Sequence, residues 1–133
     1  MKEILTEIVV QPEDIDELGH MNYLRYLTYF EKGELDWFAR IGVSEEYLIT
    51  RDIGAVLRKF DVDYLKEARL GDSLKVRTEL IHVGSRSFTF QQDMFNSENE
   101  QLTECKKTYV MFHLITRKAL PVIKIISAQM TSK

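Results

Sequence analysis

Side chains that can catalyse a reaction are concentrated in one short stretch near the start of the chain. Within nine residues the sequence places two carboxylates, Asp14 and Asp16, an imidazole, His20, and an amide, Asn22. A carboxylate can act as a general base or as a nucleophile, and an imidazole can orient a water or a substrate. This polar loop, residues 14–22, is therefore the first candidate for a catalytic site.

The same residue types also build turns and helix caps. Asp and Gly are typical of turns, and either Asn22 or His20 can occupy the position that caps a following helix. On residue types alone, a structural role is favoured for both aspartates. For His20, holding the turn closed is favoured over a contact with substrate.

The next residues predict a long amphipathic helix from Tyr23 to about Gly42. When side chains are placed at 100° steps, one wide face collects the aromatic and apolar residues; it consists of Tyr23, Tyr26, Leu27, Phe30, Gly33, Glu34, Trp37, Phe38 and Ile41. Gly33 would let a neighbouring backbone approach closely. Glu34 is the one polar anomaly on this face.

Most of the remaining chain predicts β-strands, one before Pro12 and four after the helix; their ranges are 3–11, 54–66, 74–83, 86–96 and 102–116. The last strand is apolar on both faces in its second half, which is typical of a strand at the centre of a sheet. Because the later strands are joined by short turns, we expect an antiparallel meander to which the first strand is added separately.

Two short segments complete the predicted elements. Ser44 can cap a short helix that follows the long one, whereas the tail from Pro121 fits either a helix or a strand. Within the strand 54–66, one face is expected to hold Val56, Phe60, Val62 and Tyr64. One long helix and one large sheet predict a single α+β domain of residues 1–133.

The composition argues against several classes of protein. The net charge is −3, from 18 basic and 21 acidic residues mixed along the chain, so there is no basic stripe for a nucleic acid backbone. No apolar run is long enough to span a membrane, and the first ten residues lack the regions of a signal peptide. A single cysteine, Cys105, excludes an internal disulfide. We expect a soluble cytoplasmic protein without nucleic acid or membrane partners.

The sequence also lacks the patterns of metal and cofactor sites. His20, His82 and His113 are far apart and Cys105 is alone, so there is no paired ligand spacing for a metal. Neither a GxGxxG pattern nor a phosphate-binding loop is present. We therefore expect no metal and no cofactor.

Several of these segments resemble one known family, the acyl-CoA thioesterases with the hotdog fold that include the 4-hydroxybenzoyl-CoA thioesterases. Residues 14–22, DIDELGHMN, are similar to the family's DTDxxGHVN loop, and residues 26–31, YLTYFE, to the helix after it. Residues 64–72, YLKEARLGD, resemble a turn with tyrosine, a basic residue, proline and a final Gly-Asp, and residues 83–87, VGSRS, a VGxxS hairpin. The resemblance covers about residues 5–121.

The resemblance implies a hotdog fold, in which an antiparallel sheet wraps around one long central helix. It also implies hydrolysis of an acyl-CoA to a free acid and coenzyme A without a metal. By the spacing of the family motif, Asp16 is the expected general base or nucleophile, and backbone N–H groups at the start of the helix polarise the thioester carbonyl. His20, Asn22 and Tyr23 are the expected supporting residues, and Asp14 is left with a structural role.

Substrate contacts are also suggested by the resemblance. Tyr26 and the other helix aromatics mostly form the core, with one or two at the edge of an acyl pocket. Glu34, where the family often has a basic residue, either pairs with Arg58 or faces that pocket with a raised pKa. Basic candidates for the coenzyme A phosphates, which more often are only solvated surface residues, are Lys59, Lys66, Arg69 and Arg86.

In relatives two hotdog sheets join edge to edge with the sites at the interface, so we expect a homodimer or a dimer of dimers. Such pairing would also cover the exposed edge of the sheet. The alternatives are an acyl-carrier-protein thioesterase, a hotdog dehydratase and a non-catalytic acyl-CoA-binding protein. Glu67 stands where the family usually has proline, a departure expected only to loosen a turn.

Overall fold

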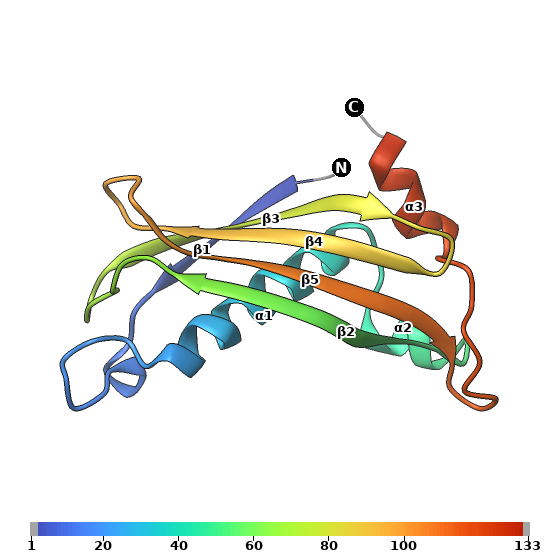
Figure 1. The fold of residues 1–133 in the computed structure, drawn as a ribbon, viewed down its shortest axis with the longest axis horizontal. Coiled ribbons are helices and arrows are strands. Elements are labelled where there is room, and N and C mark those ends of the chain that lie inside the picture. Colours follow the sequence, from blue (N-terminus) through green and yellow to red (C-terminus); the bar gives the residue numbers. More distant parts are fainter. Residues whose placement is uncertain (1–2, 132–133) are drawn as a thin grey trace.

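A curved antiparallel sheet of five strands wraps around one long helix in the computed structural model, which describes residues 3–131 (Figure 1). The spatial order of the strands is β1-β3-β4-β5-β2, and their bounds are β1 Glu3–Val9, β2 Ile53–Tyr64, β3 Ser73–Val83, β4 Ser87–Phe95 and β5 Gln101–His113. The helices are η1 Pro12–Asp14, α1 Tyr23–Arg40, α2 Glu45–Ile49 and α3 Lys124–Thr131. The predicted α+β hotdog arrangement is confirmed. The predicted domain of residues 1–133 includes four terminal residues, 1, 2, 132 and 133, that lie outside the described part.

The long helix α1 begins and ends where its sequence dictates. The Asn22 side chain accepts a hydrogen bond from the Leu24 amide at 2.9 Å, so Asn22 is the N-cap. At the other end Gly42 has φ +79°, and the Val43 amide donates to the Phe38 carbonyl at 2.9 Å. A glycine in the left-handed conformation is a common way to end a helix.

The buried face of α1 differs from the predicted face at its first turn. Tyr23 is 61% exposed, whereas Tyr29, which the prediction omitted, is 8% exposed. Tyr29 is drawn inward because its hydroxyl donates to the buried carboxylate of Asp14. From Tyr26 to Trp37 the predicted face packs against the sheet.

Two hydrophobic clusters fill the space between α1 and the sheet, one around Phe30 and the other around Trp37. Between them α1 lies very close to β3, because a Cβ atom on Gly33 would stand 2.8 Å from Val76 Cγ1 and 2.9 Å from Thr78 Oγ1. Gly33 therefore allows a close approach, as expected, but to side chains rather than to a backbone. The helix α3 resolves the open question of the tail, and its Ile126 is buried in the second cluster.

The predicted meander is only partly right. β3, β4 and β5 do form a meander, but β2 pairs with β5 on the side away from β3. The segment 65–72 is therefore not a hairpin turn: the amides of Leu65 and Lys66 donate to the Leu102 carbonyl, and the Gly71 amide donates to the Val10 carbonyl. This segment passes across the end of the sheet from one edge towards the other. The middle strand is β4, and β5 is the interior strand beside it.

A bulge in β2 reverses the face on which its side chains lie. The register with β5 shifts between Leu57 and Lys59, so Arg58 is the extra residue. Phe60 and Val62 pack against the core as predicted, but Val56, on the other side of the bulge, is 53% exposed. Arg58 consequently lies on the surface. None of the helices within residues 3–131 combines the length and the apolar content needed to cross a bilayer.

Candidate active site

The polar loop is anchored to α1 by Asp14. This carboxylate is fully buried and accepts hydrogen bonds from the Tyr29 hydroxyl, from Arg25 Nε at 2.6 Å and from the Gln11 amide at 2.9 Å. Burial acts to raise the pKa of Asp14, but the hydrogen bonds from Tyr29, Gln11 and Arg25 outweigh it and hold that pKa below its ordinary value. Asp14 therefore has a structural role, as the sequence suggested.

Only one of the two carboxylate oxygens of Asp16 accepts hydrogen bonds from its own loop. Its Oδ1 accepts from the Leu18 amide at 2.9 Å and from the His20 amide at 3.4 Å, and its backbone amide donates to the His20 carbonyl at 2.9 Å. Gly19, with φ +81°, completes this tight turn. Within residues 3–131 no donor reaches Asp16 Oδ2, and the residue is only partly buried. One carboxylate oxygen builds the loop, and the other is available to a substrate or a water.

His20 is held by a residue that the sequence reasoning did not assign to the site. Its Nε2 lies 2.6 Å from Oε2 of Glu67, and Oε1 of the same carboxylate lies 2.6 Å from the guanidinium of Arg69. The side chains of His20 and Glu67 are 43% and 36% exposed, so the contact is at the surface. The departure from proline at Glu67 thus adds a partner for the loop imidazole. The motif comparison marked this position but gave no reason to connect it with His20.

The start of α1 offers one unused backbone donor. Asn22 uses its own side chain on the Leu24 amide, and the Arg25 amide donates to the Asn22 carbonyl at 2.9 Å. The Tyr23 amide, by contrast, has no acceptor in the described part of the chain. The Tyr23 side chain is exposed, and its carbonyl accepts from the Tyr64 hydroxyl at 3.0 Å. The helix terminus therefore presents an N–H group beside the polar loop, where the helix dipole favours negative charge.

Tyr26 does not contact the surface. It is 3% exposed, its hydroxyl accepts from the Ala68 amide at 2.8 Å, and its ring packs edge-on against Tyr64. Burial raises the pKa of this phenol. Tyr26 therefore lies in the core beside the loop, which is the place favoured for the helix aromatics, and its contact with a substrate stays a prediction.

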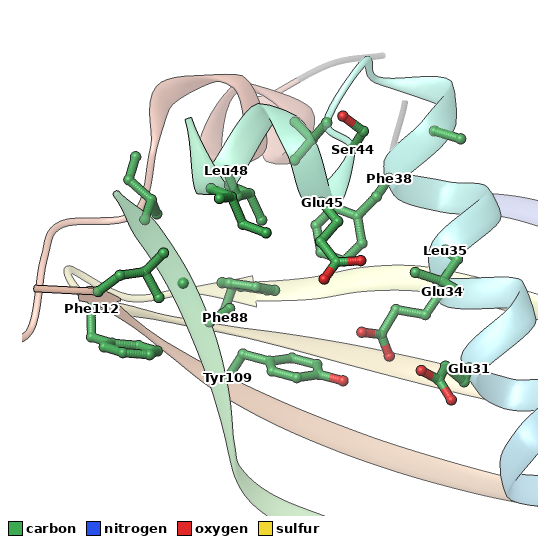
Figure 2. Close-up of a pocket in the computed structure, with 17 residues that line it drawn as sticks. Glu31, Glu34, Leu35, Phe38, Ser44, Glu45, Leu48, Phe88, Tyr109 and Phe112 are labelled. Carbon is green, nitrogen blue, oxygen red and sulfur yellow. The ribbon is translucent and has the colours of Figure 1, made fainter. Parts of the chain in front are cut away.

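A cavity of about 880 Å³ lies at the other end of α1 (Figure 2). Its walls come from the C-terminal half of α1, from α2, from the beginning of β2 and from β4 and β5. Most of the lining is apolar, with Phe38, Leu48, Phe88 and Phe112 among the larger side chains. This volume is in the range of small-molecule sites. We call it the α1–α2 cavity.

Glu34 lines this cavity and is part of a buried ion pair. It is 7% exposed, and its Oε2 lies 3.0 Å from Nζ of Lys107, which is 5% exposed. Burial, followed by the nearby negative charge of Glu34, raises the pKa of the Tyr109 hydroxyl. The predicted pairing of Glu34 with Arg58 is therefore wrong, because the bulge turns Arg58 outward.

The loop and the cavity do not meet within one chain. Glu34 is eleven residues further along α1 than Tyr23, which corresponds to about 16 Å at the helical rise. The residues that line the cavity include none of Asp16, His20, Asn22 and Tyr23. Any site that uses both features must bridge this distance.

The basic candidates are not brought together. Two of them, Arg58 and Lys59, are exposed on β2, and Arg86 is exposed just before β4. None of the three lines the cavity. Lys59 lies 3.8 Å from Asp61, while Lys66 pairs with Glu100. No three His, Cys, Asp or Glu side chains in residues 3–131 are arranged to hold a metal ion.

Comparisons with known proteins assign the family. Residues 10–129 match the model of the thioesterase-like superfamily. The acyl-CoA thioester hydrolase YbgC of Escherichia coli is 30% identical over 111 residues, which are 82% of this chain and 83% of YbgC. The long-chain acyl-CoA thioesterase FadM of Escherichia coli is 26% identical over 116 residues, 86% of this chain and 87% of FadM.

Solved structures show the same fold at lower identity. The 1,4-dihydroxy-2-naphthoyl-CoA thioesterase Slr0204 of Synechocystis superposes with a TM-score of 0.91 at 19% identity, over 98% of this chain and 96% of that one. The Staphylococcus aureus protein SAV2348, solved in complex with CoA, gives 0.90 at 17% identity, over 98% of this chain and 84% of that one. The chain therefore belongs to the thioesterase-like superfamily and is a thioester hydrolase with the hotdog fold.

Proposed function

We propose that this chain hydrolyses acyl-CoA thioesters to a free acid and coenzyme A, with Asp16 as the reacting carboxylate and without a metal. The observation that supports the proposal is that the loop end of α1 holds two groups without a hydrogen-bond partner in the described residues, one an acceptor and one a donor. Among residues 3–131, Asp16 Oδ2 accepts no hydrogen bond, and the Tyr23 amide at the helix N-terminus has no acceptor. The names of YbgC and FadM support acyl-CoA as the substrate.

The chemistry follows from these two groups. Asp16 either attacks the thioester carbonyl directly or removes a proton from a water that attacks it. The Tyr23 N–H and the helix dipole stabilise the oxyanion that develops on the carbonyl oxygen. The tetrahedral intermediate then collapses, the C–S bond breaks, and the coenzyme A thiolate leaves and is protonated. When water is the attacking group, this step gives the free acid directly. When Asp16 is the attacking group, it leaves a mixed anhydride on Asp16, which a water hydrolyses to the free acid and the regenerated carboxylate.

The remaining loop residues position these groups. Asn22 fixes the first turn of α1, so that the Tyr23 N–H keeps its direction. His20 closes the turn around Asp16 through its backbone, and Glu67 holds its imidazole in place. We assign positioning roles to Asn22 and His20 rather than a direct part in bond breaking.

We further propose that the α1–α2 cavity binds the acyl group and that it serves the polar loop of a second copy. β2 is a long edge strand, and it exposes Val56 at 53%, Leu57 at 43% and Tyr64 at 45%. Exposed apolar edge strands are ready for pairing with another chain. The cavity lies at the Ile53 end of β2, and the Tyr64 end contacts the start of α1.

An antiparallel pair of β2 strands would bring these opposite ends together. A two-fold axis at the middle of β2 places the loop end of one copy beside the cavity end of its partner. A homodimer would therefore contain two shared sites, each with Asp16 from one chain and the cavity from the other. Further association to a dimer of dimers stays a prediction from the sequence.

Replacement of Asp16 by Asn tests the catalytic assignment. Asp16→Asn keeps the hydrogen bonds of Oδ1 but removes the base or nucleophile, so kcat for thiol release from acyl-CoAs should fall by at least about hundredfold. Release of free thiol from a panel of acyl-CoAs measures this, and circular dichroism checks the fold. Unchanged thiol release would remove Asp16 from the mechanism.

Mixing two inactive variants tests the shared site. Ala39 is exposed on α1 and lines the cavity, so Ala39→Trp should block acyl binding without disturbing the core. When Asp16→Asn and Ala39→Trp chains are co-expressed with different tags, heterodimers should regain one intact site, about a quarter of the wild-type activity in a random mixture. No recovery in isolated heterodimers would place the whole site within one chain.

The same assay separates the alternatives. An acyl-carrier-protein thioesterase should prefer acyl-carrier-protein thioesters over acyl-CoAs, a dehydratase should change the acyl chain without releasing thiol, and a binding protein should only bind. The cytoplasmic location and the absence of cofactors stay predictions from the sequence.

A further inference from the structure

The charges that line the α1–α2 cavity are all of one sign. Three carboxylates, Glu31, Glu34 and Glu45, belong to its lining, and among residues 3–131 no Lys, Arg or His does. Figure 2 shows the carboxylates of Glu34 and Glu45 directed towards the space between α1, α2 and β2, with the Tyr109 hydroxyl pointing towards the Glu34 side. A ligand group that enters this cavity therefore meets negative or neutral surface on the chain that forms it.

The positive charge that balances Glu34 is out of reach of a ligand. Lys107 is 5% exposed, it lies 3.0 Å from Glu34 Oε2, and its ammonium lies over the ring of Phe60. Lys107 is not among the residues that line the cavity. Glu34 thus lines the cavity, whereas the ammonium with which it pairs lies outside the lining.

A carboxylate at the far end of an acyl chain would be disfavoured here for two reasons. It would lose water on entering a mostly apolar space without gaining a counter-ion, and it would be repelled by the carboxylates already there. An uncharged acyl chain has neither cost and gains from the burial of its apolar surface.

We propose that the cavity selects the acyl group by charge, taking uncharged acyl groups and rejecting those that end in a carboxylate, with Glu34 as the main specificity-determining residue. This inference rests on the proposed function, since it requires the acyl group of a thioester substrate to enter the cavity. Glu31 and Glu45 are exposed and add negative charge nearer to solvent.

Three acyl-CoAs of equal chain length test this proposal, with a methyl group, a hydroxyl group or a carboxylate at the far end. The length is the one at which the unsubstituted acyl-CoA is hydrolysed fastest. We expect kcat/KM for the carboxylate-terminated substrate to be lower than for both neutral ones by at least about tenfold. Values within about twofold of one another would overturn the charge selection.

Binding of the same compounds to Asp16→Asn, measured by calorimetry, separates this proposal from the proposed function. If no acyl-CoA releases thiol from wild type but the carboxylate-terminated compound still binds at least about tenfold more weakly, the hydrolytic function fails and charge selection stands. If thiol is released and the three compounds bind and react alike, the function stands and charge selection fails.

Variants of the lining carboxylates locate the effect. Glu34→Gln should raise the ratio of kcat/KM for the carboxylate-terminated substrate to that for the unsubstituted one by at least about tenfold, because it removes a negative charge and unmasks Lys107. Since Glu34→Gln leaves a buried cation unpaired and can impair folding, the exposed double variant Glu31→Gln and Glu45→Gln is the second test, with an expected rise of about threefold.

Glu46→Gln is the matched control for the variants of the lining. Glu46 follows Glu45 on α2, is also exposed and does not line the cavity, so its variant removes one charge from the same helix without changing the lining. Its ratio of kcat/KM for the carboxylate-terminated substrate to kcat/KM for the unsubstituted one should equal that of wild type. An equal rise in Glu46→Gln and in the lining variants would attribute the effect to net charge and overturn the assignment to the cavity.

Discussion

The carboxylates at the two ends of α1 lie in different environments. At the loop end, Asp14 is buried under three donors and Asp16 keeps one oxygen free in a partly exposed turn. At the cavity end, Glu34 is buried against a lysine and a tyrosine inside an apolar wall. In our proposal the first end serves a reaction that needs a free carboxylate, and the second discriminates between ligands.

This separation shows why the chain needs a second copy in our proposal. A single α1 helix keeps reaction and recognition about 16 Å apart. Edge pairing of β2 would bring the two functions together without altering either end. The comparison also predicts that the carboxylates differ in what they contribute: Asp14 to stability, Asp16 to activity, and Glu34 both to stability and to the choice of substrate.

The largest effect on stability is expected at the cavity end. Lys107→Met removes the cation and leaves the Glu34 carboxylate buried and unpaired, which should lower the free energy of unfolding by about 3–5 kcal/mol. Urea unfolding measures this. The double variant Lys107→Met and Glu34→Gln should be less destabilised than the sum of its single variants, by about 0.5–3 kcal/mol. Strict additivity would show that the ion pair has no energetic coupling.

A slightly smaller loss of stability is expected for a substitution at the loop end of α1. Asp14→Ala leaves the Tyr29 hydroxyl and the Gln11 amide without their acceptor, which should cost about 2–4 kcal/mol of unfolding free energy. Asp16→Ala, in the same loop, should cost only about 1 kcal/mol, because its hydrogen bonds are made at the surface. Equal losses in the two variants would contradict the division between an anchor and a reacting group.

The pH dependence of stability should reveal the contribution of Asp14. The folded state holds the pKa of Asp14 below its ordinary value of 3.8, so between the two values the unfolded chain binds more protons and stability increases with pH. This contribution is complete above about pH 5 and is lost as the pH falls through the folded pKa. Urea unfolding from pH 5 to pH 3 should therefore show a steeper decline for wild type than for Asp14→Asn. Parallel curves would mean that Asp14 does not make this contribution.

Local features of both ends could be predicted from the sequence. The helical period placed α1, and the residue types of the loop narrowed the cap to Asn22 or His20. Those residue types favoured a structural role for both Asp14 and Asp16, and only the family motif separated the two. The predicted aromatic face was wrong at Tyr23, whose side chain is 61% exposed, and it omitted Tyr29, which is buried with its hydroxyl bonded to Asp14. These successes depend on interactions between residues close together in the chain.

The errors come from pairings between distant residues. The β2–β5 pairing cannot be read from the alternation of either strand, and the bulge at Arg58 reverses the face of every earlier residue in β2. The true partner of Glu34 did leave a signal in the sequence. Lys107 lies two residues from Cys105 and two from Tyr109, on the inward parity of β5, where it is the one cation. A lone acid and a lone base on facing apolar surfaces are expected to pair.

The smallest effect is expected at the contact between Glu67 and His20, which lies at the loop end and is exposed. Glu67→Gln should lower kcat by about two- to fivefold, the size expected of one exposed polar contact that positions a loop. If His20 only positions the loop, the loss should be the same at every pH at which wild type is active. The kcat–pH profile of Glu67→Gln, with Glu13→Gln as an exposed control outside the contact, checks this. A shift of the profile along the pH axis would instead make the imidazole a proton carrier, and would move His20 from the supporting residues into the reaction that Asp16 performs.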